Sequence, residues 1–150
     1  MTYRIRQATA ADAAVVIEHI TRLLAELSGQ PVQLDEGKTQ HAFAQCIAGN
    51  NAIFMAFDGE KPIGVITLVE ALAIYTQGVY GVINELYVEP AYRSSGIGKL
   101  LVDAVWNYGA TQPWSRIEVG APTPDYWQRT VDFYEREGFI QVGPKLKKMY

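Results

Sequence analysis

The chain has 150 residues, of which 49% are hydrophobic and 19% charged, and its formal net charge is -3. This length and composition predict a single globular domain over residues 1–150, which buries roughly 68–70% of its unfolded surface. The negative charge argues against a general nucleic-acid-binding protein, since such proteins usually have a basic surface. Cys46 is the single cysteine, which excludes an internal disulfide and a cysteine-based metal site.

Other classes of protein are excluded by features that the sequence lacks. The two histidines, His19 and His41, lie far apart in the sequence, so we expect no metal site. The N-terminal residues contain no apolar segment of signal-peptide length, and no stretch approaches the ~18 apolar residues of a membrane span. We therefore expect a cytoplasmic protein without a nucleic-acid or membrane partner.

The first half of the chain predicts strands at both ends and helices between them. The elements are a strand at 3–8, a helix from about 10 to 28, a weaker helix from about 35 to 47, and strands at 51–57 and 62–72 joined by a turn. Thr9 and Asp12 have the spacing of a weak capping box, which predicts that the first helix begins there. Gly29 is placed near the end of this helix.

The second half predicts a further alternation of strands and helices. The elements are a strand at 81–89, a helix from about 97 to 108, a short strand at 115–121, a helix at 124–138 and a last strand at 139–150. Thr123 is the expected N-cap of the last helix, with Pro124 at its first position and Gly138 at its end. The predicted order is β-α-α-β-β-β-α-β-α-β, an α/β domain with a mixed sheet and helices covering its faces.

The stretch YRSSGIGKL, residues 92–100, leads directly into a strongly amphipathic helix. The first N–H groups of a helix are unpaired and lie at the positive end of its dipole. Gly96 and Gly98 have no side chain, so an anion can approach this backbone closely. The stretch adds further donors and charge: Arg93, Ser94, Ser95 and Lys99. It therefore predicts a phosphate site, most naturally for a pyrophosphate.

Two common phosphate-binding motifs do not match this stretch. A P-loop requires a glycine five positions before Gly98, where Arg93 stands, and a dinucleotide fingerprint requires one three positions after it, where Leu101 stands. The alternative is that the glycines only form a tight turn between a strand and a helix.

The longer segment INELYVEPAYRSSGIGKLLVDAV resembles the acyl-CoA-binding core of the GNAT family, the GCN5-related N-acetyltransferases. Its R/Q-x-x-G-x-G/A motif is matched from Arg93 through Ile97 to Gly98. FYEREGF, residues 133–139, resembles the tyrosine-bearing helix of the family, and IRQATAADA resembles its first strand and helix. The chain departs from the family in the later helix, where Trp127 and Thr130 replace an Asn and an Ala, so one side-chain contact to the pantetheine arm is not expected.

This resemblance implies a mixed, mainly antiparallel central sheet and direct transfer of an acetyl group from acetyl-CoA to an amine. The pyrophosphate-binding residues would then be Arg93, Ser94, Ser95, Gly96, Ile97, Gly98 and Lys99. The Val88 N–H would polarise the thioester carbonyl, and Leu86 and Tyr87 would flank the pantetheine. No metal and no covalent enzyme intermediate are implied.

Glu85 is the candidate base. Strand alternation places Ile83, Glu85 and Tyr87 on one face and Leu86 and Val88 on the other. If the core lies under Leu86 and Val88, Glu85 faces the cleft or a covering helix. The alternative is a solvated or salt-bridged strand carboxylate, since a local bulge could reverse the facing.

Tyr134 is the candidate acid, because its spacing to Gly138 matches the family tyrosine. The alternative is a core aromatic in a helical stripe, and the two are compatible because a tyrosine can bury its ring and present its hydroxyl. Cys46 and His41 share a helix, but their spacing matches poorly, so Cys46 is interpreted as a small buried residue.

The leading hypothesis is an N-acetyltransferase acting on a small-molecule or exposed peptide amine. The competing hypotheses are a non-catalytic acyl-CoA-binding module and a purely structural domain. The family includes dimers, so a homodimer is one oligomeric state that the resemblance implies. Three carboxylates are candidates to attract a cationic acceptor: Glu70, Glu85 and Glu89.

Overall fold

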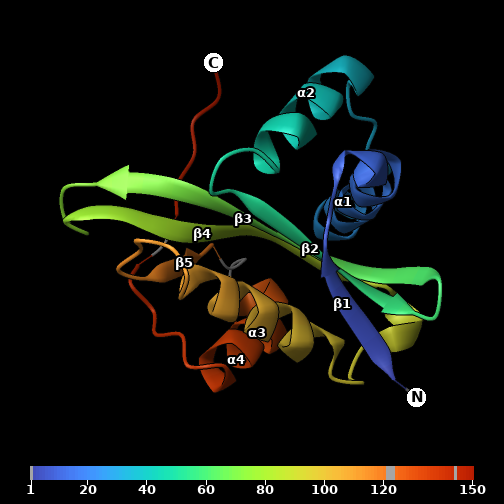
Figure 1. The fold of residues 1–150 in the computed structure, drawn as a ribbon. Helices are drawn as coiled ribbons and strands as arrows, with labels where there is room; N and C mark the ends of the chain where they lie inside the picture. Colours follow the sequence, from blue (N-terminus) through green and yellow to red (C-terminus); the bar gives the residue numbers. More distant parts are fainter. Residues whose placement is uncertain (1, 121–123, 144) are drawn as a thin grey trace.

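The structure is a computed structural model that describes residues 2–120, 124–143 and 145–150. It contains a five-stranded sheet with strand order β1-β2-β3-β4-β5. The first four strands pair antiparallel with their neighbours, and β5 pairs parallel to β4. Helices α1 and α2 cover one face of the sheet, and α3 and α4 cover the other (Figure 1). The expected mixed, mainly antiparallel sheet is thus confirmed.

The elements follow the predicted order up to the last helix. Their bounds are β1 Tyr3–Gln7, α1 Ala13–Ser28, α2 Glu36–Cys46, β2 Ala52–Asp58, β3 Lys61–Ala73, β4 Gly78–Val88, α3 Ile97–Gly109, β5 Ile117–Val119 and α4 Pro124–Arg136. Two short 3-10 turns, Ala10–Asp12 and Pro90–Tyr92, precede α1 and α3. None of the helices among the described residues has the length and apolar character needed to cross a membrane.

The last predicted strand is not formed. The described residues after α4, 137–143 and 145–150, contain no strand. Gly143 adopts a φ of +127°, which interrupts an extended path, and Ile140 and Val142 are 83% and 74% exposed. No surface among the described residues covers Ile140 and Val142, so this alternating apolar pattern does not form a strand. The predicted N-cap, Thr123, lies outside the described residues.

The start of α1 forms much as predicted, with one addition. The Asp12 carboxylate accepts a hydrogen bond from the Thr9 N–H at 2.8 Å, which is half of the expected capping box. Thr9 caps the 3-10 turn rather than α1 itself, and Asp12 is the N-cap of α1. Asp12 also receives two bonds from the Arg6 guanidinium, at 2.8 and 2.9 Å, so β1 is tied to the helix start.

Two apolar cores lie on opposite faces of the sheet. One contains Ile66 and Leu101 and packs under α3 and α4, and the other contains Val16 and Val65 and packs under α1 and α2. Because β3 is buried on both faces, residues 63–68 form a continuous buried run. The sheet therefore holds α1 and α3 at fixed positions on either side of β4.

A bulge in β4 decides which way the site residues face. Glu85 pairs with Thr67, but Ile83 pairs with Leu68, so one extra residue, Asn84, is inserted. Ile83 belongs to the α3 core, whereas Tyr87 belongs to the α1 core. The predicted common face of Ile83 and Tyr87 is therefore wrong, because the bulge reverses the alternation at Asn84.

Candidate functional site

A cleft of about 590 Å³ opens where β4 and β5 diverge. Among the described residues, the two strands pair from Gly81 to Ile83 on β4, opposite residues 117–119, and β4 continues to Val88 beyond the end of β5. The cleft is lined by residues from α1, β4, β5, the loop before α3, and α4: Leu23, Glu26, Leu27, Asn84, Glu85, Leu86, Tyr87, Val88, Tyr92, Arg93, Ser94, Gly96, Gly98, Lys99, Val119, Gly120, Arg129, Thr130, Phe133, Tyr134, Arg136 and Glu137.

The loop before α3 presents a row of backbone donors. Among the described residues, the N–H groups from Ser94 to Lys99 have no acceptor, and the first bond of the helix runs from the Leu100 N–H to the Gly96 carbonyl at 3.1 Å. Ser94 and Gly96 have φ values of +66° and +88°, which turn the loop back onto the helix start. Such a run of N–H groups favours an anion.

Gly96 and Gly98 suit their positions for different local reasons. Gly96 is the N-cap of α3 in the left-handed region, and a Cβ there would meet nothing within 4 Å. A Cβ on Gly98 would lie 3.3 Å from the ring of Phe133 on α4. Gly98 therefore allows α4 to approach α3 closely, which was not anticipated from the sequence.

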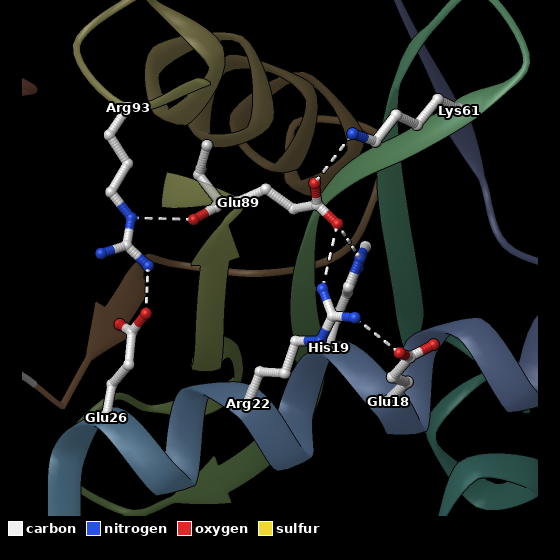
Figure 2. Close-up of polar contacts among 8 residues, drawn as sticks. Glu18, His19, Arg22, Glu26, Lys61, Glu89 and Arg93 are labelled. Carbon is white, nitrogen blue, oxygen red and sulfur yellow. Dashed lines mark hydrogen bonds and ion pairs between the residues drawn. The ribbon is translucent and has the colours of Figure 1, made fainter. Parts of the chain in front are cut away.

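The two cations of the loop are already engaged by carboxylates. Arg93 donates from Nε to the Val88 carbonyl at 2.9 Å and forms an ion pair with Glu26 of α1 at 2.6 Å (Figure 2). Lys99 lies 3.3 Å from Asp103 and 3.4 Å from Glu137, and the hydrogen bond to Asp103 is the main cause that raises its pKa. These contacts fix the loop between α1 and α4.

Arg129 is a cleft residue that the sequence analysis missed. It lies on α4 and donates a hydrogen bond to the Ser94 hydroxyl across the cleft. Among the described residues it forms no ion pair, in contrast to Arg93 and Lys99. The signal in the sequence is its spacing from Phe133, four residues on, which places both on one face of α4.

The end of β4 presents backbone groups to the cleft. Glu89 donates its N–H to the Ile63 carbonyl on β3 at 2.8 Å. Because successive residues of a strand direct their backbone groups to opposite sides, those of Val88 point away from β3, toward the side that β5 has left. The bond from Arg93 to the Val88 carbonyl agrees with this direction. The backbone of Val88 therefore faces the cleft.

Glu85 lies in the cleft wall on the α1 side of the sheet. Its carboxylate accepts a hydrogen bond from the hydroxyl of Thr67, which is 3% exposed, and its own N–H donates to that hydroxyl at 3.1 Å. No cation among the described residues pairs with it. The alternative of a salt-bridged carboxylate is thus not seen among those residues.

Tyr134 is part of both the core under α3 and α4 and the wall of the cleft. It is 5% exposed, and its ring packs edge-on against Phe133 and Phe139. Burial raises the pKa of its hydroxyl, which therefore stays protonated at neutral pH. A protonated phenol at the cleft wall can donate a proton or a hydrogen bond.

The other two acidic candidates for an acceptor are committed elsewhere. Glu89 contacts Arg22 at 3.2 Å, Lys61 at 3.4 Å and the buried His19 at 3.6 Å (Figure 2). Burial lowers the pKa of His19. Glu70 accepts a hydrogen bond from the Trp114 indole at 2.6 Å. These two carboxylates brace elements against one another and do not line the cleft.

The cysteine and its helix are structural in this arrangement. Cys46 is half-buried beside Phe43, and burial raises the pKa of its thiol. A raised thiol pKa disfavours the thiolate that a nucleophile requires. His41 is exposed. The prediction that Cys46 is a small buried residue agrees with its half-buried position.

Comparison with known proteins identifies the family. A model described as an acetyltransferase (GNAT) domain matches residues 49–141, which includes β4, the loop and α4. A search of curated proteins finds no match. A transcriptional regulator from Bacillus halodurans C-125 superposes with a TM-score of 0.82 at 22% identity, over 99% of this chain and 100% of the other.

Two structures of acetyltransferases share the fold, with TM-scores and sequence identities in a similar range. An aminoglycoside acetyltransferase from an uncultured soil metagenomic sample gives a TM-score of 0.76 at 20% identity, covering 99% of this chain and 95% of the other. A ribosomal-protein-alanine N-acetyltransferase from Brucella melitensis biovar Abortus 2308 gives 0.74 at 15% identity, covering 99% and 100%. By the family model and the fold together, this chain belongs to the GNAT family of acetyltransferases.

Proposed function

We propose that this protein transfers the acetyl group of acetyl-CoA directly to a primary amine of a small molecule or an exposed peptide. The observation that carries the proposal is that one cleft contains both an anion-binding backbone and two groups able to move protons. The backbone is the run from Ser94 to Lys99, and the proton-moving groups are Glu85 and Tyr134. We further propose that the protein is cytoplasmic and forms a homodimer, both of which follow from the resemblance to the family.

The residues present fit the phosphates of acetyl-CoA. The N–H groups of Ser94, Ser95, Gly96, Ile97, Gly98 and Lys99 have no acceptor among the described residues and lie at the positive end of the α3 dipole, which suits a pyrophosphate. Four of these residues line the cleft: Ser94, Gly96, Gly98 and Lys99. Arg93 uses Nε and one terminal nitrogen for Val88 and Glu26, so its other terminal nitrogen is available to the same anion. Leu86 and Tyr87 flank the path toward the thioester.

The chemistry follows from the groups that face the divergence of β4 and β5. Glu85 accepts a proton from the ammonium of the acceptor, and the neutral amine then attacks the thioester carbon. The Val88 N–H donates to the carbonyl oxygen as negative charge develops on it. When the tetrahedral centre collapses, the carbon–sulfur bond breaks and the Tyr134 hydroxyl gives its proton to the sulfur. The attacking nitrogen releases its second proton to solvent, and the Tyr134 oxygen takes a proton back from solvent. The products are an acetylated amine and CoA.

The test is an acetyl-transfer assay of the purified chain against a panel of primary amines and peptides, with thiol release and product mass as readouts. Glu85→Gln keeps an oxygen that can accept from Thr67 but cannot take a proton. We expect its kcat/KM to fall about 100- to 10,000-fold and to lose the acidic limb of its pH profile.

Glu18→Gln is the matched control, since Glu18 is an exposed glutamate of α1 that pairs with Arg22 and does not line the cleft. An unchanged pH profile in Glu85→Gln would remove the base assignment. A chain that binds acetyl-CoA tightly and acetylates none of these acceptors would instead be a non-catalytic acyl-CoA-binding module.

A further inference from the structure

Residues from both faces of the sheet line the cleft, and the part of the cleft on each face is called a mouth below. Leu86, Val88, Phe133 and Tyr134 pack with the core under α3 and α4, on the side of the anion-binding backbone. Tyr87 packs with the core under α1 and α2, and Glu85 lies on the same face as Tyr87 beyond the bulge. A cofactor held by its phosphates at α3 leaves the α1 mouth for the acceptor. This inference rests on the proposed function.

The α1 wall of this mouth is largely apolar. Leu23 and Leu27 are one helical turn apart and both line the cleft. Leu27 is 39% exposed, so part of its surface is available for contact. Tyr87 lies on the strand below, but it is 3% exposed and the Arg93 guanidinium lies over its ring, so it supports this wall from beneath. An acceptor that enters here therefore meets the apolar surface of the two leucines.

The charges of the cleft allow for a single ammonium. Among the described residues, three carboxylates line it: Glu26, Glu85 and Glu137. Glu26 is paired with Arg93 at 2.6 Å and Glu137 with Lys99 at 3.4 Å. Glu85 contacts the neutral Thr67 hydroxyl and keeps its charge uncompensated by any described cation.

We propose that the acceptor is a primary amine with one ammonium group carried on an apolar body. Glu85 receives the ammonium, and Leu23 and Leu27 cover the apolar part. A second ammonium on the same molecule would have to lie against the α1 wall without a partner, which disfavours polycations such as aminoglycosides. A hydroxylated body is disfavoured for the same reason, to a smaller extent.

The test compares three amines of equal chain length: hexylamine, hexamethylenediamine and aminohexanol. We expect kcat/KM for hexylamine to exceed that for the diamine by roughly tenfold or more, because the far end of the diamine is charged. Aminohexanol should fall between them. A diamine that reacts as well as hexylamine, or better, would overturn the proposal.

Two variants tie this preference to the α1 wall. Leu27→Gln should lower the hexylamine-to-diamine ratio by roughly threefold to tenfold, because it replaces apolar contact with an amide. Leu100→Gln is the matched control, since Leu100 is also a helical leucine with 39% exposure and does not line the cleft. An unchanged ratio in Leu27→Gln would overturn the assignment of this wall.

Failure of the proposed function has a different signature from failure of this inference. If the parent chain acetylates none of the three amines nor any acceptor of the wider panel, acetyl transfer itself is excluded. If it acetylates polyamines or aminoglycosides preferentially, transfer stands and the single-ammonium acceptor is wrong.

Discussion

The ring of Tyr134 packs in the core, and its hydroxyl is the proposed proton donor at the cleft wall. A substitution can separate these two roles. Tyr134→Phe keeps the ring that packs with Phe133 and Phe139 and removes only the hydroxyl. We expect kcat to fall about 100-fold or more, with acetyl-CoA affinity and melting temperature nearly unchanged. Steady-state transfer with one acceptor across pH, with thermal unfolding alongside, measures both effects.

Tyr108→Phe is the control for that prediction. Its hydroxyl donates to the Asn50 carbonyl at 2.9 Å outside the cleft, so its loss should cost about 1 kcal/mol of stability and no activity. Full activity in Tyr134→Phe would return Tyr134 to a packing role alone.

Arg129 lies across the cleft from the anion-binding backbone, and we expect its positive charge to contact a phosphate bound there. Arg129→Gln should weaken both CoA and dephospho-CoA by roughly 10- to 100-fold, because a charge-assisted hydrogen bond to phosphate is lost. Pantetheine, which has no phosphate, should bind equally to both proteins. Titration calorimetry of the three ligands measures this pattern.

Arg116→Gln is the matched control for Arg129, because it removes the same charge from a residue that pairs with Glu118 and does not line the cleft. A loss confined to CoA would place Arg129 at the ribose phosphate instead of the pyrophosphate. Equal binding of dephospho-CoA by the variant and the parent would contradict the assignment.

At the scale of elements, the junction of β1 and α1 depends on an ionised Asp12. The hydrogen bond from Arg6 is the main cause that lowers the pKa of Asp12 from its ordinary 3.8 to about 2. Because the folded-state pKa is depressed, the stabilisation is present above about pH 4 and is lost as the pH falls through about 2. The Arg6 side chain is 37% exposed, so solvent screening reduces the contribution to about 1 kcal/mol.

Asp12→Asn keeps the acceptor for the Thr9 N–H and removes the charge. We expect it to lower the free energy of unfolding by about 1 kcal/mol at pH 7 and to narrow this difference between pH 4 and pH 2. Urea unfolding at a series of pH values measures it. A difference that stays constant down to pH 2 would mean that the ion pair with Arg6 is not its source.

The elements that sequence predicted well are those whose signals are local. The α3 periodicity, the start of α2 near Asp35 and the turn after β2 all depend on residues close in the chain. The bulge at Asn84 and the contact of Gly98 with Phe133 depend on partners far away in sequence. The alternation of apolar and polar residues reveals neither feature, because this pattern depends only on neighbouring residues in the sequence.

The last strand illustrates the converse error at the same scale. Residues 139–142 alternate as a strand would, but pairing requires an accessible edge in the right direction. The neighbouring edge strand, β5, has three residues. Among the described residues, Ile140 and Val142 therefore have no strand with which to pair in register.

At the scale of the molecule, the candidate site exists only because the sheet is opened. Glu26, Glu85, the Ser94–Lys99 backbone and Tyr134 come from four separate segments, and they meet where β4 and β5 stop pairing. Motif and resemblance led to the proposed phosphate loop and to Glu85 and Tyr134 as proposed proton-moving residues, and these assignments stay predictions. Their shared cleft, and the pairing of Arg93 with Glu26 across it, required the fold.

The most direct test of the central claim is thermal unfolding of the chain with CoA, with acetyl-CoA and with pantetheine. If the Ser94–Lys99 backbone holds the phosphates, CoA at about 100 times its dissociation constant should add about 2.7 kcal/mol and raise the melting temperature by about 5 to 10 °C. Acetyl-CoA should act similarly, and pantetheine at the same concentration should have little effect. An unchanged melting temperature in saturating CoA and acetyl-CoA would contradict the proposed cofactor site and the transfer that depends on it.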